Sequence, residues 1–300
     1  MPDPKYMVIA GATGVGKTDL ALELAQSLHT EIVGADAFQI YMGLDVLTGK
    51  PTPSQLRSIK HHLVSFVPLT DTFDAHRYAA LARETILTLN QRGIVPLVVG
   101  GTGFYVYALE RPLPSLPSGN HPLRSELGHR SVQALLNELA LRDPVAFDRI
   151  DRQNKRRVIR ALEVCMISGR PFSSFTEGSP PDPAIPRVFL ERPRAALVER
   201  INRRVEQMFA HGVVGEVAAV TQIGSTASRA IGFSLIRLFL AGEISESSCR
   251  DLMCKQTRQY AKRQTTWFRR QQYEFISADS CLERLRTAFR RRFPEGSELS

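Results

Sequence analysis

A glycine-rich segment near the start of the chain has the residue types and spacing of a phosphate-binding loop. Residues 6–18 are an apolar stretch that runs directly into the pattern G-x-x-x-x-G-K-T. Glycines let such a turn point successive backbone N–H groups at one anion, and the helical pattern of residues 19–28 directs the positive end of a helix dipole there. Because both spacing and context fit, a glycine-rich loop without a phosphate role is the weaker interpretation. The predicted loop consists of Gly11, Ala12, Thr13, Gly14, Val15, Gly16, Lys17 and Thr18.

A carboxylate, Asp36, follows a second predicted strand at residues 31–35. The carboxyl ends of neighbouring parallel strands converge on one crevice, so we expect Asp36 to lie close to the phosphate loop. There it could act as a general base or hold a metal ion. A role as the N-cap of a helix is equally open, because Asp is favoured at such positions.

Thr102 follows another predicted strand, residues 95–99, in the segment Gly100-Gly-Thr-Gly103. A nucleotide hydrolase would usually have a magnesium-organising acid at such a strand end, and this segment has none. The glycines allow close backbone approach, and the Thr102 hydroxyl could donate to a leaving phosphate or to a substrate. An ordinary strand-to-helix turn is the alternative.

Basic residues recur at helical spacing in two places. If residues 149–160 form one helix, a single face carries Arg149, Arg152, Arg156 and Arg160. The second face carries Lys255, Arg258, Lys262 and Arg269, with Met253, Tyr260 and Trp267 opposite. Such stripes suit contacts with phosphates, although a solvated surface remains the alternative, particularly because Glu163 could pair with Arg160. Arg229 has little support from its sequence context alone.

The composition is that of a globular protein with a basic surface. The 300 residues are 43% hydrophobic, and 39 Lys and Arg against 30 Asp and Glu give a formal net charge of +9. A polyanionic partner is therefore plausible, although many enzymes of small metabolites are also basic. No apolar run approaches the roughly 18 residues of a membrane span, and no secretory signal is evident, so we expect a cytoplasmic protein without a membrane partner.

The order of elements predicts an α/β fold. Candidate strands at residues 7–10, 31–35, 63–67 and 95–99 alternate with helical patterns, as in a parallel sheet. Stretches rich in proline and serine near residues 112–122 and 173–186 flank a helical segment, after which 188–190 could return to the sheet and 194–211 form a helix that ends before Gly212. The remainder looks helical. We predict a P-loop core at 1–117 and 187–300, with a helical insertion at 118–186.

These segments together resemble the bacterial tRNA dimethylallyltransferases. The matching segments are 11–18, 36–45 with 48–51, 61–63, 73–78, 100–105, 156–164 and 258–269. The resemblance implies a P-loop NTPase-like parallel sheet flanked by helices, with a small helical insertion domain. It also implies transfer of a dimethylallyl group to the exocyclic N6 amine of the adenosine 3′ of the anticodon, with release of diphosphate.

For the donor, the resemblance implies that the phosphate loop holds the diphosphate of dimethylallyl diphosphate. Asp36 would take the proton from the attacking amine. Lys17, Thr18, Arg229 and a Mg²⁺ ion bound at Thr18 would stabilise the charge on the departing diphosphate. Thr102 would hydrogen-bond where the two substrates meet.

For the acceptor, the resemblance implies an adenosine extruded from the tRNA anticodon stem-loop. Gln39 would read the edge of the base and Phe38 would stack on the base or act as a wedge, while Ala37 replaces the serine usual in the family. The insertion would bind tRNA through Arg124, Arg156, Arg157, Val158, Ile159 and Arg160. We expect a monomer.

Two other functions remain as rivals on sequence alone. In a small-molecule P-loop kinase, the loop would hold ATP and Asp36 would activate a substrate hydroxyl. A nucleic-acid-binding protein with a vestigial loop is less consistent with the sequence, because Lys17 and Thr18 are both present.

Overall fold

The chain divides into two compact units. The computed structural model describes residues 3–111, 113–175 and 182–294. The larger unit comprises residues 1–110 and 181–300, and the smaller unit comprises residues 111–180. Pro112, Pro180 and Pro181, which belong to the proline-rich stretches noted above, lie outside the described residues. No helix in the described part of the chain is long and apolar enough to cross a membrane.

A parallel sheet of six strands in the order β3-β2-β4-β1-β5-β6 forms the centre of the larger unit. The strands are β1 (Met7–Gly11), β2 (Ile32–Ala35), β3 (His61–His62), β4 (Leu97–Gly100), β5 (Arg187–Glu191) and β6 (Glu274–Ser277). Ala10 of β1 and Ala35 of β2 both pair with Gly100 of β4. This register brings the carboxyl ends of three strands together, as the convergence argument requires, and the predicted fold class is confirmed.

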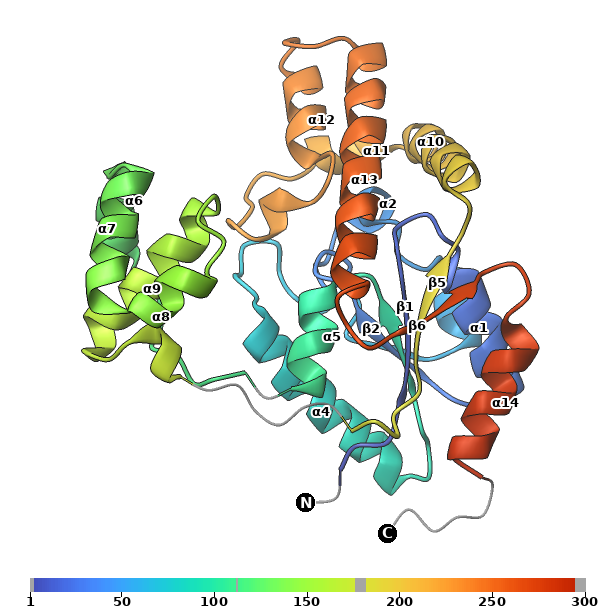
Figure 1. Cartoon of the computed structure of the whole chain (residues 1–300). Helices are drawn as coiled ribbons and strands as arrows, with labels where there is room; N and C mark the ends of the chain where they lie inside the picture. The colour runs from blue at the N-terminus through green and yellow to red at the C-terminus, as the bar shows by residue number, and fades with distance from the viewer. Residues whose placement is uncertain (1–2, 112, 176–181, 295–300) are drawn as a thin grey trace. The chain divides into compact units, whose positions relative to one another are not determined.

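Helices cover both faces of this sheet (Figure 1). On one face, Met7 and Ile9 pack in a cluster with residues of α1 (Lys17–Ser27) and α14 (Leu282–Arg292). The other face carries Phe189, which contacts Phe268 at the end of α13 (Glu246–Phe268). Successive strand side chains point to opposite faces, so a strand with apolar residues throughout can serve both layers.

Several further helices complete the larger unit. They are α2 (Asp45–Thr48), α3 (Pro53–Ser58), α4 (Ala75–Gln91), α5 (Gly103–Glu110), α10 (Arg194–Ala210), α11 (Val213–Ala218), α12 (Phe233–Leu240) and the 3-10 helix η2 (Ala227–Arg229). The helix predicted at 194–211 is confirmed as α10, and it ends before Gly212, whose φ of 82° is one that glycine tolerates best.

Two strand assignments made from the sequence are wrong. The strand expected at residues 63–67 lies instead at His61–His62, because Leu63 and Ser65 have φ angles of 57° and 54°, which an extended strand cannot contain. Val67 forms only an isolated bridge with Tyr41. β6, in contrast, lies in a region that looked helical.

In its described residues, the smaller unit contains four helices and one 3-10 turn. They are α6 (His121–His129), α7 (Val132–Arg142), α8 (Pro144–Arg149), α9 (Lys155–Ser168) and η1 (Phe172–Ser174). Its core includes Leu127, Leu135, Leu139 and Leu162. The prediction of one continuous arginine face over residues 149–160 is wrong. Helix α8 ends at Arg149, and Asn154 caps a separate helix, α9, by accepting a hydrogen bond from the Arg157 N–H.

Candidate active site

The phosphate loop has the backbone geometry that its glycines predict. It runs from the end of β1 into α1, and Gly14 and Gly16 have φ angles of 81° and 103°. Gly16 is the N-cap residue of α1, so the free N–H groups of the first helical turn lie at the loop. A side chain at either position would strain the backbone.

Lys17 is folded back over this loop. Its ammonium donates to the carbonyl oxygens of Gly11 and Ala12 at 2.8 and 2.9 Å. Burial lowers the pKa of Lys17 from its ordinary 10.5 to about 8, although the nearby negative charge of Asp36 raises it; the positive charge of Arg204 lowers it further. Burial therefore disfavours the charged form of Lys17, and an anion bound beside it would favour that form.

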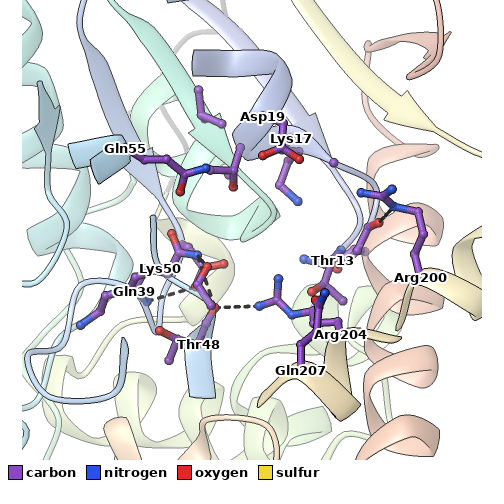
Figure 2. Close-up of a pocket in the computed structure, with 18 of the residues that line it drawn as sticks. Thr13, Lys17, Asp19, Gln39, Thr48, Lys50, Gln55, Arg200, Arg204 and Gln207 are labelled. Carbon is purple, nitrogen blue, oxygen red and sulfur yellow. Dashed lines mark hydrogen bonds between the residues drawn. The ribbon is translucent and has the colours of Figure 1, made fainter. Parts of the chain in front are cut away.

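A cavity of about 410 Å³ lies over the loop. Predicted site residues that line it are Thr13, Gly14, Gly16, Lys17, Thr18, Asp36 and Gln39. Figure 2 shows Lys17 and Asp19 on one side of this cavity and Thr48, Arg204 and Gln207 on the other. The cavity thus combines the phosphate loop, the end of β2 and a wall from α10 that the sequence analysis did not assign.

Asp36 and Thr102 lie on adjoining turns beside the cavity. Oδ1 of Asp36 accepts hydrogen bonds from the N–H groups of Phe38 and Gln39 at 2.9 and 3.3 Å, so the carboxylate caps a turn, and no helix begins there. Among the described residues, Oδ2 has no hydrogen-bond partner, which leaves it able to accept a proton. Oγ1 of Thr102 accepts a hydrogen bond from the Ala37 N–H at 2.9 Å, and the Thr102 N–H donates to the Ala35 carbonyl at 3.2 Å.

Gln264 of α13 joins this turn to the phosphate loop. Its side-chain Oε1 accepts from the Thr13 N–H at 2.9 Å, and its Nε2 donates to the Gly101 carbonyl at 2.8 Å. The residue is 6% exposed. A Cβ at Gly101 would lie 2.3 Å from this Nε2, so glycine is needed for the approach. One turn earlier, burial and then the charge of Asp36 raise the pKa of Tyr260, which keeps its hydroxyl protonated.

Arginines that follow β5 in the chain, directly after the strand and in α10, donate hydrogen bonds to the phosphate loop and to the nearby Thr48 carbonyl. Nε of Arg192 donates to the Val15 carbonyl, and Nε of Arg200 donates to the Gly14 carbonyl, both at 2.8 Å. Arg204, one turn further along α10, donates to the Thr48 carbonyl at 2.9 Å. The sequence analysis missed all three. Their signal was the i, i+4 spacing of Arg200 and Arg204 on a helix that directly follows a strand next to β1.

The residues expected to read the base lie close to this wall. Nε2 of Gln39 donates to the carbonyls of Thr48 and Gly49 at 3.3 and 3.0 Å. Phe38 is half-buried and packs against an apolar cluster that contains Leu44. Their roles toward RNA stay predictions.

The structure does not bring Arg229 to the cavity. This residue is exposed at the end of η2 and is not among the residues that line the cavity. Its predicted contact with the diphosphate stays a prediction.

The basic side of α13 is unevenly exposed. Lys255, Lys262 and Arg269 are exposed, whereas Arg258 is half-buried and donates to Asn202 Oδ1 at 3.0 Å. Met253 is buried on the opposite side, as its spacing predicts. A contact between this face and RNA stays a prediction.

Buried Glu163 binds two of the arginines expected to contact RNA in the smaller unit. Its Oε2 accepts from Arg124 at 2.8 Å and from Arg160 at 2.5 Å, and its Oε1 accepts from the Asn120 N–H at 2.7 Å. Burial alone would raise the pKa of Glu163, but these hydrogen bonds and charges hold it below its usual value.

The segment 156–160 is only partly available to a ligand. Arg156 and Arg157 are exposed, whereas Val158 is 0% exposed in the core of the smaller unit and Ile159 is half-buried against it. The Val158 side chain faces this core, and the predicted contact of the segment 156–160 with tRNA stays a prediction.

The comparisons with known proteins agree with one another. A family model described as IPP transferase matches residues 39–271. The tRNA dimethylallyltransferase of Akkermansia muciniphila is 36% identical over 267 residues, which cover 89% of this chain and 91% of that protein. The tRNA dimethylallyltransferase 1 of Trichlorobacter lovleyi is 40% identical over 277 residues, with 89% and 91% covered.

Solved structures give the same result. The full-length tRNA isopentenylpyrophosphate transferase of Bacillus halodurans matches with a TM-score of 0.71 and 30% identity, over 99% of each chain. A eukaryotic dimethylallyltransferase acting on tRNA matches with a TM-score of 0.76 and 25% identity, over 97% of this chain and 77% of that one.

Proposed function

The chain belongs to the IPP transferase family, and from this premise we propose that it transfers a dimethylallyl group from dimethylallyl diphosphate to the N6 amine of the adenosine 3′ of the tRNA anticodon. The observation that carries the proposal is one cavity lined both by a phosphate loop with a half-buried lysine and by a carboxylate with a free oxygen. The first suits a diphosphate and the second suits an amine that must lose a proton.

In the donor half, the diphosphate lies on the N–H groups of the loop and of the first turn of α1. Lys17 leaves the carbonyls of Gly11 and Ala12 and binds a phosphate oxygen, so its charge opposes the charge that grows on the leaving group. Arg229 contributes the same chemistry if it reaches the cavity with both substrates bound.

In the acceptor half, the adenine N6 nitrogen attacks C1 of the dimethylallyl group while the bond from C1 to the diphosphate oxygen breaks. The displaced proton passes from N6 to Asp36 Oδ2, and diphosphate departs. The fixed hydrogen bonds of Asp36 Oδ1 and of Thr102 support this geometry, because they hold both side chains before substrate arrives.

A Mg²⁺ ion fits the donor half. Thr18, Asp19 and Asp36 line the same cavity, and Mg²⁺ is commonly held by few protein oxygens together with phosphate oxygens. The Thr18 hydroxyl would be its protein ligand. The ion would neutralise charge on the leaving diphosphate.

Exposed arginines of the smaller unit bind the anticodon stem-loop. Arg156 and Arg157 are exposed at the start of α9 and support a role on the phosphate backbone. We expect the enzyme to act as a monomer in the cytoplasm.

A labelled-donor experiment tests the proposal against the kinase alternative. Purified protein is mixed with unmodified tRNA and either labelled dimethylallyl diphosphate or ATP labelled on its γ-phosphate. We expect the prenyl label alone to enter tRNA, on N6 of the adenosine 3′ of the anticodon after digestion to nucleosides. Phosphoryl transfer to a small hydroxyl compound without prenyl transfer would establish the kinase instead.

A further inference from the structure

The short helix α2, beside the cavity, is bound at both ends by side chains from other parts of the chain. At its start, Oε1 and Oε2 of Glu216 accept hydrogen bonds from the Val46 and Leu47 N–H groups, both at 2.8 Å. At its end, backbone carbonyls accept hydrogen bonds from the Gln39 side chain (Figure 2). We propose that Glu216 is a positioning residue that fixes α2 and, through α2, the Gln39 amide. This inference rests on the proposed function and on the predicted role of Gln39 toward the base.

The start of α2 depends on Glu216 because the helix has no side-chain cap of its own. Its N-cap residue is Leu44, which makes no side-chain cap hydrogen bond, and the helix has only four residues. So short a helix is not stable alone, and its first N–H groups need partners. The Glu216 carboxylate supplies two acceptors from α11 and places a negative charge at the positive end of α2. Glu216 forms no ion pair within the described part of the chain, so the two N–H groups are its partners.

The end of α2 determines which atom of the Gln39 amide is left for a ligand. Nε2 of Gln39 donates to the Thr48 and Gly49 carbonyls at 3.3 and 3.0 Å, which uses both of its hydrogens. Gln39 lines the cavity, and its Oε1 accepts no hydrogen bond from any described residue. Oε1 can therefore accept from the N6 amine of adenine, whereas guanine presents an oxygen at the corresponding position and would be repelled. A loosened α2 would let the amide rotate and lose this preference.

A purely structural role for Glu216 makes a different prediction. Leu44 and Leu47 pack in one apolar cluster with Val213 and Val217 of α11. If this packing alone fixes α2, loss of the Glu216 carboxylate lowers stability and affects all substrates alike. Val217→Ala weakens the packing but keeps both hydrogen bonds of Glu216, so it reports the effect of lower stability by itself.

A double-mutant cycle between Glu216 and Gln39 separates the two roles. The value of kcat/KM for unmodified tRNA, with the prenyl donor saturating, is measured for wild type, Glu216→Gln, Gln39→Ala and the double variant. We expect Glu216→Gln to lower kcat/KM by about 10-fold, as for loss of a hydrogen bond to a charged group. If Glu216 acts through Gln39, the same change in the Gln39→Ala protein should lower it by less than about 2-fold. Equal losses in the two backgrounds, or no loss in either, would overturn the inference.

A second measurement compares the affinities for two anticodon stem-loops, one with adenosine and one with guanosine directly 3′ of the anticodon. We expect Glu216→Gln to narrow the preference of wild type for adenosine, because Oε1 of Gln39 is no longer held toward the base. Val217→Ala should leave the preference unchanged, and exposed Glu243→Gln should match wild type in both measurements. A preference that narrows equally in Glu216→Gln and Val217→Ala would make Glu216 a structural residue.

Glu216→Asp keeps the charge but shortens the side chain, and it replaces Glu216→Gln in both measurements if the latter does not fold. We expect a smaller loss of kcat/KM that again depends on Gln39, and the same outcomes would overturn the inference. Wild-type protein that prenylates tRNA while the Glu216 and Gln39 changes act independently refutes this inference alone. Wild-type protein that transfers no prenyl group to tRNA refutes the proposed function.

Discussion

Two pairs of basic residues, one pair in each unit, are held in different ways. In the smaller unit, Arg124 and Arg160 both pair with the buried carboxylate of Glu163. In the cavity of the larger unit, the side chains of Lys17 and Arg204 donate hydrogen bonds only to backbone carbonyls among the described residues. The difference distinguishes two roles of a basic side chain. A cation paired with a buried carboxylate stabilises the fold, whereas a cation without a carboxylate partner is available to an anionic ligand.

The largest expected effect is at Asp36, the carboxylate whose charge acts on both Lys17 and Arg204. We expect Asp36→Ala to lower the rate of prenyl transfer by about 10²- to 10⁴-fold, the usual contribution of a general base. Donor affinity should survive, because the residue is assigned to the proton and not to the diphosphate. Single-turnover rates and donor titration measure the two separately, and a mutant that turns over like wild type removes Asp36 from the reaction.

A change at Gln264 tests whether the phosphate loop and the turn after β4, which contains Gly101, must be held together. Gln264→Glu keeps the acceptor for the Thr13 N–H but puts an oxygen against the Gly101 carbonyl. A buried polar group left unsatisfied costs about 1–3 kcal/mol, so we expect turnover to fall by about 10- to 100-fold.

The fall in turnover should exceed any loss of donor affinity, because the hydrogen bond from Gln264 to the Gly101 carbonyl positions the turn after β4 against the phosphate loop. Gln259→Glu, on the exposed side of α13, is the matched control. If activity falls only in proportion to the fraction of protein that is folded, Gln264 is a packing residue and not a positioning residue.

A change at Glu163 in the smaller unit should lower stability and not turnover, in contrast to the changes at Asp36 and Gln264. We expect Glu163→Gln to lower the free energy of unfolding by about 1–3 kcal/mol, because two charged hydrogen-bond partners lose their carboxylate. Since its folded pKa lies below the ordinary 4.5, its contribution to stability is present above pH 4.5 and is lost as pH falls through the folded value. Urea unfolding at pH 7 and at pH 3 measures both effects, with exposed Glu126→Gln as the control. Prenyl transfer at low temperature should persist.

The smallest expected effect is at Arg156 and Arg157, which form no ion pair among the described residues. The double change to Ala should weaken tRNA binding and flatten its log–log salt dependence by roughly 1.5, since each lost phosphate contact contributes about 0.7–0.9. Arg142→Ala, which removes an arginine already paired with Glu138 at 2.8 Å, should leave the slope unchanged. Identical slopes in all three proteins would mean that pairing does not distinguish RNA-binding arginines from structural ones.

The parts of the site that were predictable depend on local geometry. The glycine spacing of the phosphate loop requires left-handed backbone at Gly14 and Gly16, and that requirement is visible in eight consecutive residues. The position of Asp36 next to it follows from the general rule that the ends of parallel strands converge.

The parts that were missed depend on distant contacts. Gln264 lies 251 residues from Thr13, and Arg204 lies 156 residues from Thr48. Nothing in the sequence around either residue specifies its partner. The apolar run at 63–67 had the composition of a strand, but backbone turns at Leu63 and Ser65 override that preference. The arginine stripe at 149–160 failed for a similar reason, since the cap at Asn154 starts a separate helix.

Proton uptake on donor binding tests most directly whether the unpaired cations of the cavity hold the diphosphate. The pKa of Lys17 is about 8 in the free protein and should return toward 10.5 beside an anion. At pH 8, donor binding to wild type should therefore take up about half a proton more than binding to Lys17→Ala, measured by calorimetry in buffers of different ionisation enthalpy. Equal uptake by the two proteins would contradict the account, because the diphosphate would then not be neutralised by Lys17.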